Sequence, residues 1–193
     1  GTLPPGPAAF LEGGAPSSLQ SGAAEDACTS RTTMNPTPPG TLFLLAADHR
    51  ESLRRALVAV APGSEPDLRA AKHLIWEGLQ TAAATRPAEG LGILVDEETG
   101  AEVARAARAA GLVLAMPVER SDQRVFSFEH GDNFGAHLER FGPDLAKVLV
   151  RWNPDDVPAL KAEQAGPLRQ LSDWRQPRRL PLLFDLLVPP TPG

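Results

Sequence analysis

The sequence contains little of what would place it in several common protein classes. Its 193 residues include a single cysteine, Cys28, which excludes both a disulfide framework and a cysteine-based metal site. No apolar run is long enough to span a bilayer. The chain does not open with a charged segment followed by an apolar one, as a secretion signal does. These absences predict a soluble, cytoplasmic protein without a membrane partner.

The sequence also lacks the clustered lysines and arginines that bind nucleic acids or anionic membranes. The formal net charge is −5 and the sequence pI is about 5.4. The only local concentration of arginines lies in residues 175–179, where it flanks an expected turn. Because phosphate-binding proteins carry basic patches, we do not expect a nucleic-acid partner.

Residues 1–40 differ in composition from the rest of the chain. They are rich in Pro, Gly, Ser, Ala and Thr and show almost no apolar periodicity. Such a segment buries too little apolar surface to offset the entropy lost on ordering. The sequence therefore predicts a disordered segment or linker over residues 1–40, and a folded domain over residues 41–193.

From residue 41 onward, short apolar runs alternate with helical patterns. The predicted strands are residues 42–47, 92–95, 112–116, 147–152 and 182–188, with a short one at 125–128. The predicted helices are residues 51–60, 66–85, 101–110, 132–141 and 156–174. This alternation indicates an α/β fold with a parallel sheet and right-handed crossovers.

Two parallel architectures fit this alternation, and the missing glycines favour one of them. An open doubly wound sheet usually carries a glycine-rich phosphate loop after its first strand. Here Asp48, His49, Arg50 and Glu51 occupy that position. We therefore predict a TIM-type (β/α) barrel. A complete barrel has eight units and about 250 residues, so this chain has room for about five and should leave strand edges exposed.

Polar residues follow the predicted strands, at the end where barrel active sites lie. Asp48, His49 and Arg50 leave the first strand, Asp96 and Glu97 the second, and Glu119 the third. We expect these side chains to converge on one rim.

Lys147 stands near the start of an apolar strand. Alternation puts Lys147, Leu149 and Arg151 on one face and Val148 and Val150 on the other. If the branched face meets the helices, Lys147 points into the barrel, where desolvation would lower its pKa and make it nucleophilic. The alternative is a structural lysine near the bottom rim, paired with a carboxylate.

Asp185 interrupts the apolar run of residues 182–188. A carboxylate is costly there unless it is paired, so Asp185 is either a general acid/base facing a substrate hydroxyl or an ion-pair partner of Lys147 or Arg151.

The acids and arginine beyond the first two strands have structural alternatives as well. Arg50 is suited to clamp a phosphate, and Asp48 to orient Lys147. The alternative is that residues 48–51 form the N-cap and first turn of a helix, where Glu51 has a structural role. Asp96 and Glu97 either line the pocket or begin the next helix.

We expect no metal and no cofactor. A divalent ion at Asp96 and Glu97 is disfavoured because no histidines stand near them in the sequence. His73, His130 and His137 are interpreted as packing, surface or loop residues.

Six short motifs occur in the order expected for a known family. They are LAADHRESL (45–53), GILVDE (92–97), AMPVE (115–119), FGAH (134–137), KVLVRWNP (147–154) and LFDLLVP (183–189). Together they resemble the aldolase-like domain fused behind 5-dehydro-2-deoxygluconokinase of inositol catabolism, which is similar to class I tagatose-bisphosphate and sulfosugar-phosphate aldolases.

This resemblance implies a β/α barrel that cleaves a phosphorylated keto-sugar acid through a Schiff base. The implied substrate is 2-deoxy-5-keto-gluconate 6-phosphate, and the products are dihydroxyacetone phosphate and a three-carbon semialdehyde. Lys147 matches the pocket lysine of the fourth strand, and Asp185 stands where the family has a longer acid/base glutamate. The family's Schiff-base lysine lies on a sixth strand, beyond Gly193.

The resemblance implies pocket roles for Lys147 and Asp185. With Asp48, which we interpret from its position after the first strand, these are the expected catalytic residues. The expected substrate-binding residues are His49, Arg50, Asp96, Glu97, Glu119 and Arg151. The expected partners are a phosphorylated sugar acid, a fused or associated sugar kinase, and a second copy of the chain. Two alternatives stay open, namely a non-catalytic domain that binds a phosphosugar or supports a kinase, and an inactive truncated fragment.

Overall fold

A single sheet of five parallel strands forms the centre of the fold. The computed structural model describes residues 40–85 and 89–190. The strands are β1 (Phe43–Ala47), β2 (Leu91–Val95), β3 (Val113–Pro117), β4 (Leu145–Arg151) and β5 (Leu182–Leu187). They pair in chain order, β1-β2-β3-β4-β5, and every pair is parallel. A doubly wound sheet would reverse its order at a switch point, so the predicted incomplete TIM-type α/β barrel is confirmed.

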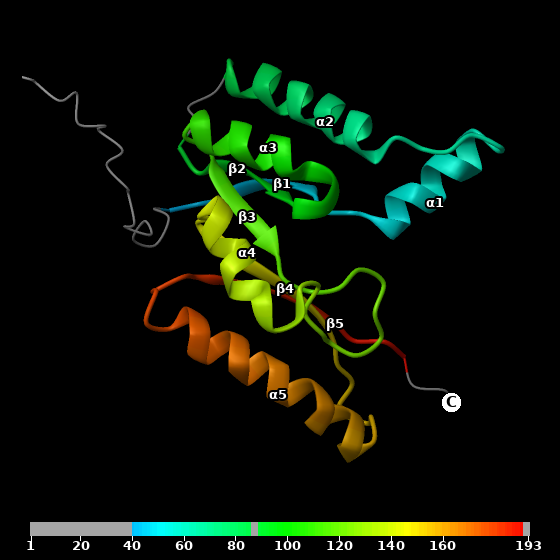
Figure 1. Cartoon of the computed structure of the whole chain (residues 1–193), viewed down its shortest axis with the longest axis vertical. Coiled ribbons are helices and arrows are strands. Elements are labelled where there is room, and N and C mark those ends of the chain that lie inside the picture. Colours follow the sequence, from blue (N-terminus) through cyan, green and yellow to red (C-terminus); the bar gives the residue numbers. More distant parts are fainter. Residues whose placement is uncertain (1–39, 86–88, 191–193) are drawn as a thin grey trace, which may run out of the picture. The chain divides into compact units, whose positions relative to one another are not determined.

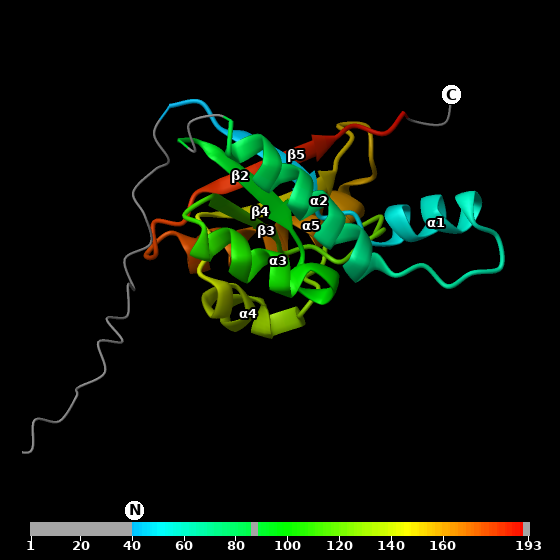
Figure 2. The same cartoon turned by 90° about the horizontal axis from the view of Figure 1, so that it is seen from above.

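The helices lie on one side of this sheet. They are α1 (Glu51–Val60), α2 (Leu68–Ala83), α3 (Glu97–Ala109), the short 3₁₀ helix η1 (Gly131–Asn133), α4 (Phe134–Phe141) and α5 (Pro158–Arg175). Figures 1 and 2 show α2 to α5 packed around the outside of the curled sheet. Right-handed crossovers between neighbouring parallel strands place successive helices on the same face. Helix α1 stands away from the sheet in Figure 2 and has no buried residue.

The two faces of the sheet bury different residues. The main core lies between the sheet and the helices and includes Val148 and Val150 of β4. A small second cluster of Leu94, Ala115 and Leu145 lies on the opposite face. The predicted alternation along β4 is therefore confirmed, because its branched residues meet the helices and Lys147 faces the inside of the curl.

Two local predictions differ from the structure. The helix predicted at 101–110 begins at Glu97, because the Asp96 side chain caps it by accepting from the Thr99 backbone N–H. The predicted strand at 125–128 is wrong. There Phe128 makes only an isolated bridge to Glu119, and glutamine side chains accept from the Phe126 and Ser127 N–H groups in place of a neighbouring strand.

The sheet has two edges within the described residues, β1 and β5. Phe184 and Leu186 of β5 are 48% and 50% exposed, and Val188, just after the strand, is 60% exposed. Exposed apolar edge strands favour pairing with another chain. This exposure agrees with the expected homo-oligomer, which stays a prediction. No helix in the described part of the chain has the length and apolar character to cross a membrane. The expectation of disorder for residues 1–40 falls, Gly40 apart, outside the described residues.

Gly100 allows α3 to approach β2 closely, and this contact yields a testable prediction. A Cβ atom at Gly100 would overlap Val95 Cγ2 and lie 3.4 Å from Lys72 Cδ. We expect Gly100→Ala to lower the free energy of unfolding by about 1–3 kcal/mol, measured by urea denaturation. Gly78→Ala in α2 is the control, because no atom lies within 4 Å of its added Cβ. It should raise stability by about 0.5–1 kcal/mol, and equal stability of the two variants would contradict this packing.

Candidate functional site

A cavity of about 330 Å³ opens at the carboxyl ends of the strands. Its walls come from β1, β2, β4 and β5 and from the segments that follow β1 and β3. Seven of the predicted site residues line it, namely Asp48, His49, Arg50, Glu119, Lys147, Arg151 and Asp185. The structure thus brings together residues that lie up to 137 positions apart in the sequence, as the shared rim of parallel strands requires.

Lys147 is the central charge of this cavity. Its ammonium Nζ donates to Asp48 Oδ2 at 2.8 Å and to Glu119 Oε1 at 2.7 Å. The side chains of Lys147, Glu119 and Asp48 are only 5%, 7% and 11% exposed. One buried cation is therefore held between two buried carboxylates from the ends of β1 and β3.

The electrostatics of this group determine the protonation of Lys147. Burial alone would lower the pKa of Lys147, but the neighbouring Glu119 and Asp48 carboxylates outweigh it, and the pKa is raised. Burial is also the main reason that the pKa of Glu119 is raised, with Lys147 opposing it. Lys147 is consequently an ammonium at neutral pH, which can donate hydrogen bonds but cannot attack a carbonyl.

Glu119 retains one unused acceptor. Its Oε1 bonds to Lys147, whereas its buried Oε2 has no hydrogen-bond partner among the described residues. A buried acceptor without a partner is costly. Glu119 is one of the residues that line the cavity.

Arg50 is occupied by protein acceptors. Its Nη1 donates to Glu129 Oε2 at 2.6 Å and its Nη2 donates to the Glu119 carbonyl oxygen at 2.8 Å. The side chain is buried. Arg50 thus fastens the segment after β3 to the end of β1, and the buried Nε is the one atom of its guanidinium without a partner there.

The mouth of the cavity carries other basic side chains. His49 and Arg120 are exposed, and Arg151 is half-buried with its Nη1 on the Gln123 carbonyl oxygen. Asp185 lines the same cavity from β5 but is exposed, and no ion pair of its carboxylate occurs within the described residues. The alternative of an ion pair between Asp185 and Lys147 or Arg151 therefore does not occur in this part of the chain.

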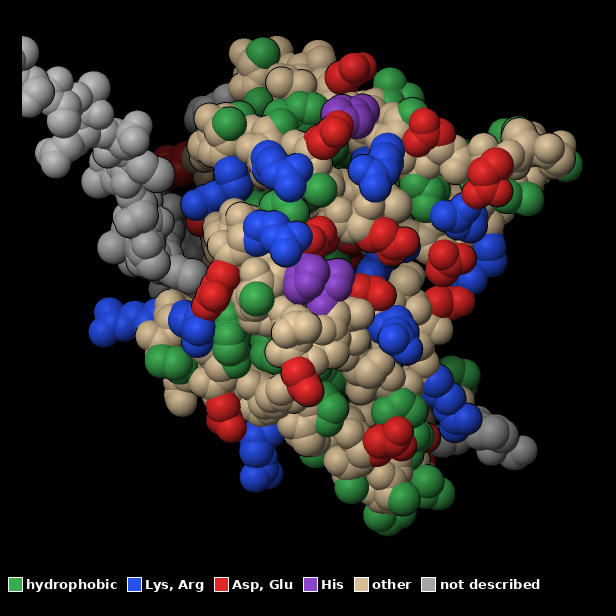
Figure 3. Space-filling model, in the orientation of Figure 1, with side chains coloured by type: hydrophobic (Ala, Val, Ile, Leu, Met, Phe, Trp, Pro, Cys, Tyr) green, Lys and Arg blue, Asp and Glu red, His purple; other side chains and the backbone are tan. Residues whose placement is uncertain are grey.

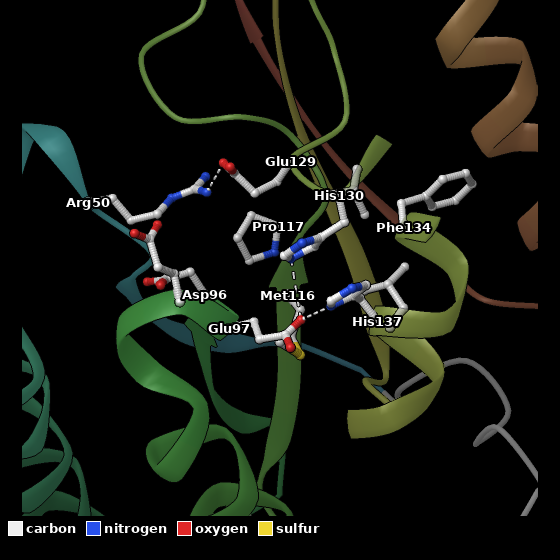
Figure 4. A pocket seen from close by; sticks show the side chains of 12 residues that line it. Arg50, Asp96, Glu97, Met116, Pro117, Glu129, His130, Phe134 and His137 are labelled. Atoms are coloured by element: carbon white, nitrogen blue, oxygen red, sulfur yellow. Dashed lines mark hydrogen bonds and ion pairs between the residues drawn. The ribbon is translucent and has the colours of Figure 1, made fainter. Parts of the chain in front are cut away.

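Asp96 and Glu97 lie apart from this cavity. Asp96 is buried, caps α3 and forms an ion pair with Lys72 of α2, which is fully buried. Burial and the nearby Arg50 guanidinium lower the pKa of Lys72 to about 8, so Lys72 is still mostly charged at neutral pH. Glu97 turns to a second, smaller pocket, shown in Figure 4, where His130 and His137 stand beside it.

The sequence analysis missed three of these charged or ligating residues. Lys72 lies on the buried stripe of α2 with Leu68, Trp76 and Leu79, and a lysine in such an apolar stripe was the available signal. His130 and His137 seemed remote from Glu97 because 33 and 40 positions separate them from it. The premise that no histidine stands near Glu97 is wrong in the fold.

Residues 9–192 match the model of a protein family described as "Uncharacterized protein conserved in bacteria (DUF2090)". The chain belongs to the DUF2090 family. No curated protein matches it. The cavity around Lys147 and the pocket beside Glu97 are thus two candidate sites on a DUF2090 barrel.

Proposed function

We propose that this DUF2090 chain is an aldolase-like lyase whose cavity around Lys147 binds a phosphorylated keto-sugar acid. The observation that carries the proposal is the Lys147 ammonium buried between Asp48 and Glu119, with Glu119 Oε2 left free. Burying paired charges costs desolvation energy, which a core of apolar side chains at the same place would not. Perturbed, buried ionisable groups in a cleft are typical of sites that bind or transform polar substrates.

The charges at the mouth suit an anionic, hydroxylated substrate. A phosphorylated sugar acid carries a phosphate and a carboxylate, and Arg151, Arg120 and His49 offer donors to both. The volume of about 330 Å³ lies in the range of small-molecule sites. The resemblance of six motifs supplies the substrate, 2-deoxy-5-keto-gluconate 6-phosphate, which the kinase of the same pathway would deliver.

In the proposed reaction, the bond between C3 and C4 of the keto-sugar acid breaks. The C3 hydroxyl loses its proton to a carboxylate, a role that we assign to Glu119 because its Oε2 has no other hydrogen-bond partner among the described residues, and C3 becomes an aldehyde. The electron pair of the broken bond moves to C4, next to the C5 carbonyl or its imine, and C4 then takes up a proton. Dihydroxyacetone phosphate and the three-carbon semialdehyde account for all atoms of the substrate.

Lys147 supports this reaction as a charged group. An imine needs a neutral amine, and Lys147 is held as an ammonium by two carboxylates. We therefore assign Lys147 to donate to a substrate oxygen and to stabilise negative charge that develops there. The imine-forming lysine of the resembled family lies on a different strand.

The test is release of dihydroxyacetone phosphate from 2-deoxy-5-keto-gluconate 6-phosphate, followed with a coupled enzyme. Glu119→Gln preserves the shape of the side chain and removes the base. It should lower the rate by about 10²–10⁴-fold, the usual contribution of a general acid or base. The control is Glu163→Gln, since Glu163 is exposed and outside the cavity, and it should leave the rate unchanged.

A second candidate function is binding of a phosphosugar without turnover, and the paired ammonium of Lys147 favours it. If Lys147 remains an ammonium throughout, the cavity is suited to bind a phosphosugar without turnover. Saturable binding of 2-deoxy-5-keto-gluconate 6-phosphate, measured by calorimetry without any product release, would support this binding module in place of the lyase. If neither cleavage nor binding is observed, both proposals are wrong.

A further inference from the structure

The second pocket contains a carboxylate and two imidazoles from separate segments. Glu97 is the first residue of α3 and follows β2, whereas His130 precedes η1 and His137 lies in α4, after β3. Figure 4 shows the three side chains turned toward one another, and Figure 3 shows histidines gathered amid acidic and basic groups on the visible face. No residue of this trio lines the cavity around Lys147, and Arg50 is the only residue common to the linings of the two pockets.

The geometry of this trio converges on one point. Glu97 Oε2 lies 2.6 Å from His137 Nδ1 and 3.4 Å from His130 Nε2. The two imidazole rings stack with centroids 3.6 Å apart and planes within 2°. Because an imidazole nitrogen binds a metal in the plane of its ring, one of the two rings must rotate before both can hold a single ion. The three ligand atoms all lie within 4.8 Å of one another.

The trio is held in place but remains accessible. Arg140 Nη1 donates to the other Glu97 oxygen, Oε1, at 2.9 Å and orients that carboxylate. Glu97, His137 and His130 are 17%, 27% and 33% exposed.

Two of the neighbouring charges in the pocket are already compensated. Arg50 is paired with Glu129, and Asp96 with Lys72. The pocket volume of about 20 Å³ holds one water-sized molecule beside the trio.

We propose that Glu97, His130 and His137 bind a divalent transition-metal ion of the Zn²⁺ class, with a fourth position open to water. Two imidazoles, one carboxylate and an open position form a ligand set that zinc accepts. Tetrahedral zinc with bonds of about 2.0–2.1 Å requires ligand atoms about 3.3 Å apart. The His130–Glu97 pair already has this separation, and the His137–Glu97 pair must open by about 0.7 Å from its hydrogen-bonded distance.

This inference is independent of the proposed lyase. The metal would lie in a pocket separate from that of Lys147, Asp48 and Glu119, so the cleavage assay and the metal assay fail or succeed separately. Arg140 would act in the outer shell by orienting the Glu97 carboxylate.

The experiment adds Zn²⁺ to metal-stripped protein and follows binding by calorimetry and by NMR of the four histidine side chains. We expect one ion per chain at saturation and shifted imidazole signals for His130 and His137, with His49 and His73 unchanged. At zinc concentrations about 100 times the dissociation constant, the melting temperature should rise by roughly 5 °C or more.

Three ligand variants and one matched control decide the outcome. Glu97→Gln, His130→Asn and His137→Gln should each weaken binding by more than about tenfold, since even outer-shell partners contribute about 10–100-fold. His73→Gln is the control, because His73 forms a similar 2.9 Å contact with Glu102, outside any three-ligand group found in the described residues. Circular dichroism confirms that each variant is folded. Absence of saturable binding, or binding that survives in folded Glu97→Gln and His137→Gln, would overturn the proposal.

Discussion

Replacing Lys147 with methionine is expected to lower the free energy of unfolding by about 3–5 kcal/mol at neutral pH. Methionine has a similar length but no charge. The substitution leaves Glu119 and Asp48 as two buried carboxylates without their shared counterion. The loss of one partner from a buried ion pair is costly because the remaining charge is neither solvated nor compensated. Urea denaturation followed by circular dichroism measures the effect.

The pH dependence of this loss follows from the two pKa shifts. The folded pKa of Lys147 is raised, so its contribution in the wild type is present at neutral pH and is lost as pH rises through that pKa. In Lys147→Met, Glu119 loses the cation that opposes its raised pKa. Folded Glu119 then binds its proton more tightly than in the unfolded chain. The stability of the variant should therefore recover as pH falls from 7 toward about 4–5.

A matched control comes from the small number of lysines. The sequence contains three, Lys72, Lys147 and Lys161. Lys161 is half-buried and donates to the Pro154 carbonyl oxygen in a solvent-exposed hydrogen bond, and Lys161→Met should change stability by no more than about 0.5 kcal/mol. An equally small loss in Lys147→Met, or a loss that does not shrink in acid, would show that the buried charge cluster does not hold the strand ends together.

Replacing Lys72 with methionine is expected to have a second large effect, again about 3–5 kcal/mol of destabilisation. Lys72 is fully buried in α2 and pairs with Asp96, which is 2% exposed. Without Lys72, the Asp96 carboxylate remains buried under the helices with only its capping bonds to Thr99. Thermal and urea unfolding of the variant measure the loss.

A double variant separates the charge effect from simple loss of packing. Asp96→Asn removes the negative charge and keeps a side-chain oxygen for the Thr99 N–H, since asparagine caps helices about as well as aspartate. The pair Lys72→Met/Asp96→Asn should therefore recover most of the stability lost in Lys72→Met. If the double variant is as unstable as the sum of the two single variants, the ion pair contributes no coupling.

The order and type of the secondary structure follow from local patterns. Period-two runs and helical spacing indicated five parallel strands with helices between them, and the missing glycines after residue 47 favoured the barrel over the open sheet. These features are readable because each depends on residues a few positions apart. The helix predicted to start at 101 was late by four residues because a capping aspartate competes with the apolar pattern as a start signal.

The cavity around Lys147 was also largely predictable from sequence. Residues that follow parallel strands meet at one rim by geometry, and alternation along β4 decided that Lys147 points inward. The local pattern left open whether a carboxylate pairs with Lys147 and which one. The structure selects Asp48 and Glu119, and not Asp185, which is exposed on the edge strand β5.

The sequence alone therefore determined the α/β alternation, the strand order typical of a barrel and the rim on which charged residues gather. Only the tertiary structure decided which charges pair, that Asp96 turns to Lys72, and that Glu97 stands beside His130 and His137. The physical reason is distance along the chain. Strand and helix patterns arise from neighbours, whereas ion pairs and ligand sets join side chains tens of positions apart, and their partners depend on how the helices pack over the sheet.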